Sequence, residues 1–313
     1  MKKEHTEAIA NKFIEQLAKG VVPWRKPWTP TPGIALHNWS SKRPYRGINT
    51  LLLGLEQIDK GYSSPAWTTY NGALKALGWD GEGGRKGASD WRAANPGKGV
   101  RKGEKGTHVV LWKPIEVEDK ATGEKKAVWF SRLYTVFNTD QIDGIDWKAP
   151  EVSDPITVPD ALDQIVAGYQ NGPSIRHQAQ DAAFYLPSRD EIVLPLVEQF
   201  DTVEGYAETL CHELVHSTGH SSRLGRFTND QIGCRQDYAR EELVAEIGAS
   251  ILAQSAGLSL DLEQTAAYVG GWLKALNDDH SLIITAAQQA QKAVDRITAQ
   301  QAIEVEEDLD AAA

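Results

Sequence analysis

The 313-residue sequence predicts an α+β protein of two domains, because both its charge and its tryptophans are divided between two halves. Residues 1–150 carry 24 Lys and Arg against 16 Asp and Glu, whereas residues 151–313 carry 9 against 27. Nine of the ten tryptophans also lie in the first half. The chain is long enough for two domains, and the asymmetry indicates a basic, aromatic-rich half joined to an acidic half.

A polar stretch with three prolines, residues 138–160, separates the two halves. This composition is typical of a linker. We therefore expect four parts: a first domain over 1–145, a linker over 146–160, a second domain over 161–300, and a disordered acidic tail over 301–313.

The basic half mixes helical and strand patterns, so we expect an α+β fold for it. Apolar residues recur every three to four positions over 4–18, and a second apolar helical run ends near Ile58. A short helix follows Trp67. The glycine-rich, basic residues 78–106 are typical of a mobile loop. Two alternating runs within 107–137 predict a β-hairpin.

Cationic and flat aromatic side chains are interleaved along the basic half. Lysine and arginine follow phosphates while aromatic rings stack on unpaired bases, and each stack contributes about 1–3 kcal/mol. For any single tryptophan the competing interpretation, a place in the core, is favoured. For the set as a whole we favour binding of single-stranded nucleic acid. The candidate DNA-binding residues are Trp24, Arg25, Lys26, Trp28, Arg43, Tyr45, Arg46, Trp67, Tyr70, Lys102, Lys105 and Lys113.

The acidic half also mixes strands and helices. A short hairpin is expected within 172–195, where Phe184–Leu186 turns back into Glu191–Leu194. Periodic apolar residues then predict helices over four stretches. These are 201–220, 237–256, 262–276 and 282–297.

The helix over 201–220 carries the pattern H-E-x-x-H, in which His212 and His216 lie one turn apart with Glu213 beside the first. Two imidazoles at this spacing converge on one metal ion, usually zinc, and the intervening glutamate reaches a metal-activated water as general base. Zinc is the first choice of metal. A His/His/Glu site also accepts manganese or another divalent ion.

A catalytic zinc site needs a third protein ligand. Ser222 occupies the position of the third histidine of metzincins, and His220 follows His216 too closely. Glu242 and Glu246, one turn apart on the next helix, are better candidates, but spacing alone does not order them. The pattern resembles that of the glutamate zincins. This resemblance implies Glu242 as the ligand and Glu246 as the residue that orients a histidine, with Glu246 as the alternative ligand.

Three further expectations concern single residues and location. Glu241 is interpreted as a solvated charge, Tyr238 as a candidate for stabilising the oxyanion, and Cys211 as a small core residue. Because we find neither a signal peptide nor an apolar run long enough to cross a membrane, we expect a cytoplasmic protein without membrane contact.

Several motifs together resemble the ArdC antirestriction proteins of conjugative plasmids, over nearly the whole chain. They are Trp67-Thr-Thr-Tyr70, Lys102 to Thr107, Phe137 to Gln141, Phe184-Tyr185, Ile192 to Pro195, His212 to His220, Glu241 to Glu246 and Trp272-Leu273. The resemblance implies an N-terminal single-stranded-DNA-binding domain and a C-terminal zincin-like metallopeptidase domain. It also implies protection of incoming DNA from host restriction.

Two mechanisms stay open under this resemblance. As a peptidase, the protein would cut a host restriction enzyme or another protein. As a non-catalytic binding protein, it would shield DNA or sequester the restriction enzyme, and the metal site would be structural.

Overall fold

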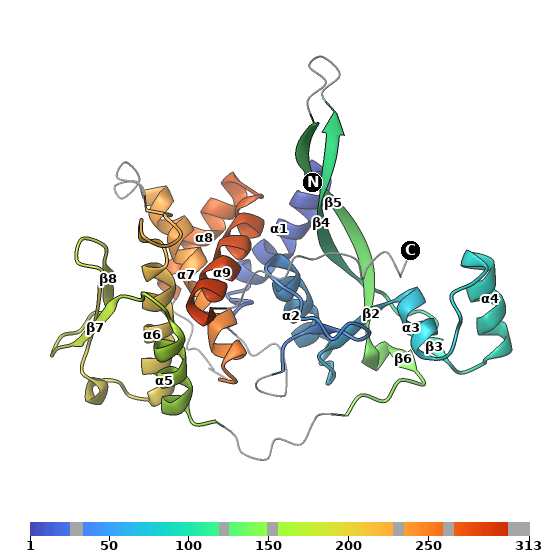
Figure 1. Ribbon diagram of the computed structural model, residues 1–313, viewed down its shortest axis with the longest axis horizontal. Coiled ribbons are helices and arrows are strands. Elements are labelled where there is room, and N and C mark those ends of the chain that lie inside the picture. Colours follow the sequence, from blue (N-terminus) through green and yellow to red (C-terminus); the bar gives the residue numbers. More distant parts are fainter. Residues whose placement is uncertain (26–33, 119–124, 149–155, 228–234, 259–265, 300–313) are drawn as a thin grey trace.

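Helices occupy the middle of the molecule, and sheets lie toward opposite ends of its longest axis (Figure 1). The computed structural model describes residues 1–25, 34–118, 125–148, 156–227, 235–258 and 266–299. The predicted acidic tail over 301–313 lies outside this part of the chain.

The basic half is built on a four-stranded sheet with the order β1-β2-β5-β4. Its strands are β1 (His37–Asn38), β2 (Ala66–Thr69), β4 (Thr107–Glu118) and β5 (Lys125–Asn138). Strands β4 and β5 form a long antiparallel hairpin in which Thr107 pairs with Val136. The predicted hairpin over 107–137 is therefore confirmed.

Two helices of the basic half contact helices of the acidic half. Helix α1 (Lys3–Ala18) buries Ile9, Phe13 and Leu17, the apolar residues that recur along one of its faces. It contacts helix α8 (Ala266–Asp278) of the acidic half, whereas α2 (Ile48–Lys60) lies between β4 and helix α9 (Leu282–Thr298).

Residues 78–106 are not the mobile loop that their glycines suggested. Trp79 and Ala88 are buried against Leu74, and this small cluster holds a helix in place. The glycines instead start and end elements, since Gly83 precedes the helix with a φ of 76°, which glycine adopts without strain. Residues 78–106 contain α4 (Gly84–Ala94) and β3 (Gly99–Val100). The preceding helix is α3 (Tyr70–Ala76), and β3 is antiparallel to β6 (Ile142–Asp143), which follows the short helix η1 (Thr139–Gln141).

The acidic half begins with α5 (Val158–Gly168), which starts inside the predicted linker because Thr157 caps it. A three-stranded sheet of order β7-β9-β8 follows. Strand β8 (Phe184–Leu186) is antiparallel to β9 (Glu191–Leu194), as the predicted hairpin requires. Strand β7 (Ser174–His177) is parallel to β9, and the short helix η2 (Val197–Gln199) leads out of the sheet.

Four helices complete the acidic half, close to the predicted ranges. They are α6 (Val203–Ser217), α7 (Arg235–Ser255), α8 (Ala266–Asp278) and α9 (Leu282–Thr298). Helix α7 contacts α6, α8 and α9. Among the described residues, none of the helices has the length and apolarity needed to cross a membrane.

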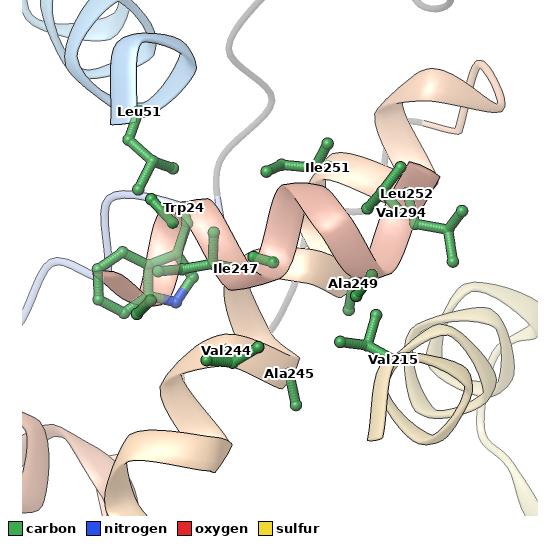
Figure 2. Packing of buried hydrophobic residues seen from close by; sticks show 14 of the residues in the cluster. Trp24, Leu51, Val215, Val244, Ala245, Ile247, Ala249, Ile251, Leu252 and Val294 are labelled. Atoms are coloured by element: carbon green, nitrogen blue, oxygen red, sulfur yellow. The ribbon is translucent and has the colours of Figure 1, made fainter. Parts of the chain in front are cut away.

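The two halves share one hydrophobic core. Trp24 is fully buried and packs edge to face on Trp272 of α8, with 5.5 Å between ring centroids. Figure 2 shows Trp24 beside Val244 and Ile247 of α7, with Leu51 of α2 next to it. The core is therefore continuous from the N-terminal half into α7 and into α6, the helix that carries the H-E-x-x-H pattern.

Candidate metal centre and nucleic-acid interface

Helix α6 presents the two histidines from a well-anchored segment. The Thr202 hydroxyl caps the helix by accepting a hydrogen bond from the Gly205 N–H at 3.0 Å. Ala207, Leu210 and Leu214 are buried. Packing of this apolar side leaves the histidines at the edge of the helix that faces α7.

Helices α6 and α7 approach closely at a glycine. A Cβ at Gly248 would lie 2.8 Å from Cγ1 of Val215, which is shorter than van der Waals contact. Val215 lies between the two histidines in sequence, and Gly248 lies two residues after Glu246. The close approach therefore brings the polar edges of the two helices together.

Three donor atoms converge where these edges meet. Nε2 of His216 lies 3.0 Å from Nε2 of His212. The Glu242 carboxylate lies 3.5 Å from Nε2 of His212 and 3.4 Å from Nε2 of His216. Two imidazole nitrogens and one carboxylate oxygen facing a common point form the donor set of a zincin-type site. These residues thus fit a divalent metal.

Glu213, the candidate general base, lies on the same helix as the two histidines. It follows His212 directly and is buried, with 6% of its surface exposed. It is also one of the groups that raise the pKa of His216.

Glu241 is not a solvated charge, and that prediction is wrong. Its Oε1 lies 3.2 Å from Nδ1 of His216, on the side of the ring opposite Glu242. Arg226 donates to both carboxylate oxygens, at 2.6 Å and 3.0 Å. A carboxylate behind a metal-ligating histidine fixes the tautomer and orientation of the ring. No local spacing indicated this role, because Arg226 and Glu241 are fifteen residues apart in sequence.

Glu246 lies behind the other histidine. Its Oε1 is 3.8 Å from Nδ1 of His212, and both of its oxygens accept hydrogen bonds from Arg25 at 2.9–3.1 Å. Glu246 therefore approaches His212 from the side opposite Glu242. This position favours Glu242 over Glu246 as the third ligand.

The proton balance of the centre is set by its carboxylates. Burial acts to lower the pKa of His216, but hydrogen bonds to Glu241 and Glu242 outweigh it and raise this pKa to about 10. Burial likewise acts to raise the pKa of Glu242, yet its hydrogen bonds to both histidines hold it well below the ordinary value. In the metal-free protein the imidazole thus holds a proton where a metal would bind.

Two other residues of the acidic half were singled out from the sequence. Tyr238 lies one turn before Glu242 on α7 and is 58% exposed, so it is accessible on the helix that carries Glu242. Cys211 is fully buried, and burial raises the pKa of its thiol to about 12. It is therefore the unreactive core residue that was expected.

The aromatic part of the predicted DNA-binding set is largely buried. Trp24 and Trp67 have no exposed surface, so the prediction that their rings stack on bases is wrong. Trp67 instead packs edge to face on Tyr62. Tyr45 is mostly buried, and burial raises its pKa to about 12, whereas Tyr70 is 39% exposed.

The cationic part of the set divides in two. Arg25 is 5% exposed and lies at the metal centre, and Arg46 pairs with Asp295 of α9, so neither is available to a phosphate. The exposed members are Arg43, Lys102, Lys105 and Lys113. Lys26 and Trp28 lie outside the described residues.

The fold and the centre together define a zincin-like domain joined to a second domain that is built on the four-stranded sheet. The family model for the N-terminal domain of anti-restriction factor ArdC matches residues 3–137, and a zincin-like metallopeptidase model matches residues 160–289. The chain belongs to the ArdC-type antirestriction family, as the sequence motifs indicated.

Crystal structures of the antirestriction protein ArdC from plasmid R388 are similar over nearly their whole length. The metal-free form is 39% identical, covers 93% of this chain and 96% of its own, and has a TM-score of 0.72. The Mn(II)-bound form is 38% identical, covers 94% and 97%, and has a TM-score of 0.73.

Two further relatives differ in length. Protein y4eC of Sinorhizobium fredii is 31% identical over 311 residues, which are 94% of this chain and 92% of that protein. The DNA primase TraC of Escherichia coli is 36% identical over 338 residues. The chain spans 98% of its own length in that match but only 28% of the primase.

Proposed function

We propose that this protein counteracts host restriction by hydrolysing a peptide bond at a divalent-metal centre, while its N-terminal half binds single-stranded DNA. The observation that carries the proposal is the convergence of His212, His216 and Glu242 beside the buried Glu213. We therefore propose that these four residues, carried by two packed helices, form a zincin-type site.

The metal would be held by His212, His216 and Glu242. When bound, a divalent ion supplies Lewis-acid activation of a water molecule and of the substrate carbonyl. The related ArdC of plasmid R388 holds Mn(II) in one crystal structure. A donor set of two imidazoles and one carboxylate suits zinc as well as manganese, so we propose either ion.

The chain's own residues supply the acid–base chemistry and the orientation. The Glu213 carboxylate accepts the proton of the attacking water and passes it to the leaving amine. Glu241, fixed by Arg226, holds the His216 ring in place from behind. Tyr238 is the candidate donor to the oxyanion, from the turn that precedes Glu242 on α7.

DNA binding is proposed for the exposed cations of the N-terminal half. Arg43, Lys102, Lys105 and Lys113 are exposed, and Tyr70 adds an accessible ring. Because so many of the predicted aromatic residues are buried, contacts with phosphates carry more of this proposed interface than base stacking does.

The decisive experiment is protection of incoming DNA in cells that carry a restriction system. Glu213→Gln keeps the size of the side chain and removes the base, so we expect peptide hydrolysis to fall about 10²–10⁴-fold with metal binding retained. Protection should fall with it. Glu204→Gln, which changes an exposed glutamate in the first turn of the same helix, is the matched control.

A double variant separates the two mechanisms. Lys102→Gln with Lys105→Gln removes two exposed cations of the N-terminal half without touching the metal centre. Full protection by Glu213→Gln, combined with loss of protection in the lysine double variant, would contradict the peptidase proposal. The protein would then act by shielding DNA or sequestering the restriction enzyme.

A further inference from the structure

We propose that Arg25, a residue of the N-terminal half, is a positioning residue of the metal centre in the C-terminal half. It ties α6 to α7 one turn away from the proposed metal ligands. The inference rests on the metal site proposed above. It gives Arg25 a role different from the DNA contact that its sequence surroundings suggested.

The contacts of Arg25 reach both ligand-bearing helices. Its guanidinium donates from Nε to Oε2 of Glu246 at 3.1 Å and from Nη2 to Oε1 at 2.9 Å. Nη2 also lies 3.6 Å from Oε1 of Glu208. Glu208 precedes His212 by one turn of α6, and Glu246 follows Glu242 by one turn of α7. Arg25 therefore bridges the two helices beside the donor set.

The bridge also holds the carboxylate that lies behind one ligand. Glu246 lies 3.8 Å from Nδ1 of His212, and its two oxygens are held by the fork of Arg25. A planar guanidinium fixes a carboxylate in two directions at once, which an ammonium does not do. The rotation of the His212 ring thus depends on a side chain that lies 221 residues away from Glu246 in sequence.

Charge gives a second reason for an arginine at this place. Carboxylates from both helices lie at the centre. Among the residues that the structure describes, Arg25 and Arg226 are the cations that pair with them. Arg226 holds Glu241 behind His216, and Arg25 holds Glu246 behind His212. Removing Arg25 leaves the buried Glu246 carboxylate without its guanidinium partner, which is costly. The five carboxylates are Glu208, Glu213, Glu241, Glu242 and Glu246.

The position of Arg25 is itself fixed by the shared core. The preceding residue, Trp24, is fully buried against Trp272, and Val22 is buried as well. The Arg25 side chain is 5% exposed. Arg25 therefore reaches α6 and α7 from an anchored segment of the N-terminal half, and the ligand geometry depends on the contact between the halves.

The experiment compares two arginines of the full-length protein. Arg46 also joins the halves through a charge pair, with Asp295 of α9, but it does not contact Glu208 or Glu246. We would measure the affinity for Zn²⁺ by competition with a chromophoric chelator in Arg25→Met, Arg25→Lys and Arg46→Met. The unfolding temperature without metal reports on the docking of the two halves.

We expect Arg25→Met to weaken Zn²⁺ binding about 10-fold or more, the usual effect of losing a residue behind a metal ligand. Arg46→Met should change the affinity less than about threefold, although both variants lower the unfolding temperature. Equal loss in the two variants, or wild-type affinity in Arg25→Met, would overturn the assignment.

Two further outcomes are decisive. If Arg25→Met does not fold, Arg25→Lys keeps the charge without the fork, and unchanged Zn²⁺ affinity in that variant overturns the inference. If the wild-type protein itself binds no divalent metal, the proposed function fails together with this inference. Failure of the Arg25 variants alone leaves the proposed function intact.

Discussion

His216 lies between two carboxylates that act on its two ring nitrogens. Glu241 is 3.2 Å from Nδ1 and Glu242 is 3.4 Å from Nε2. Although burial opposes the charge, these contacts raise the pKa of His216 to about 10. The raised pKa stabilises the metal-free fold below the ordinary histidine value of 6.5. That contribution is lost as the pH rises toward 10.

A metal must displace this proton, so we expect metal affinity to weaken as the pH falls below 10. At pH 7.5 binding should release about one proton. Calorimetric titrations of Zn²⁺ in two buffers with different ionisation enthalpies measure the release. Glu241→Gln removes a carboxylate that raises this pKa, so the variant should release less. Equal heats in the two buffers for the wild type would contradict a protonated His216.

At the scale of the elements, the contact between α6 and α7 depends on Gly248. A Cβ there would lie 2.8 Å and 2.9 Å from the two methyl carbons of Val215, a branched side chain on α6 with few alternative rotamers. The two helices would have to separate, and the donors they carry would separate with them.

We therefore expect Gly248→Ala to lower the free energy of unfolding by about 1–3 kcal/mol. Gly271→Ala on α8 is the control, because nothing lies within 4 Å of its added methyl group. Combining Gly248→Ala with Val215→Ala should cost less than the sum of the single changes, by about 0.5–3 kcal/mol. Urea denaturation of the four proteins measures this coupling, and strict additivity would argue against the clash.

At the scale of the whole molecule, the two halves share a core through Trp24, so we expect them to unfold together. Trp24→Ala should lower the free energy of unfolding by about 3–5 kcal/mol. Differential scanning calorimetry should show a single transition that shifts to lower temperature. Trp39→Ala removes a half-buried ring and should shift it much less. Two transitions, of which one is unaffected by Trp24→Ala, would show that the halves are independent.

Local patterns in the sequence predicted most of the elements and the two histidine donors, whereas the choice of Glu242 over Glu246 came from the resemblance to the glutamate zincins. The hairpin over 107–137 and the helices that carry His212, His216 and Glu242 follow from apolar periodicity and from one four-residue spacing. These features depend on neighbouring residues only. The α+β class follows from the same patterns.

The tertiary structure decided which of the remaining residues serve the site. Trp24 and Trp67 belong to the candidate DNA-binding set, but burial in a core is set by distant packing partners. Glu241 was interpreted as a solvated charge and Arg25 as a DNA contact, because their sequence neighbours do not show what they pair with. Each is placed by a partner that no sequence period connects to it, and only the folded chain brings Arg25 beside Glu246.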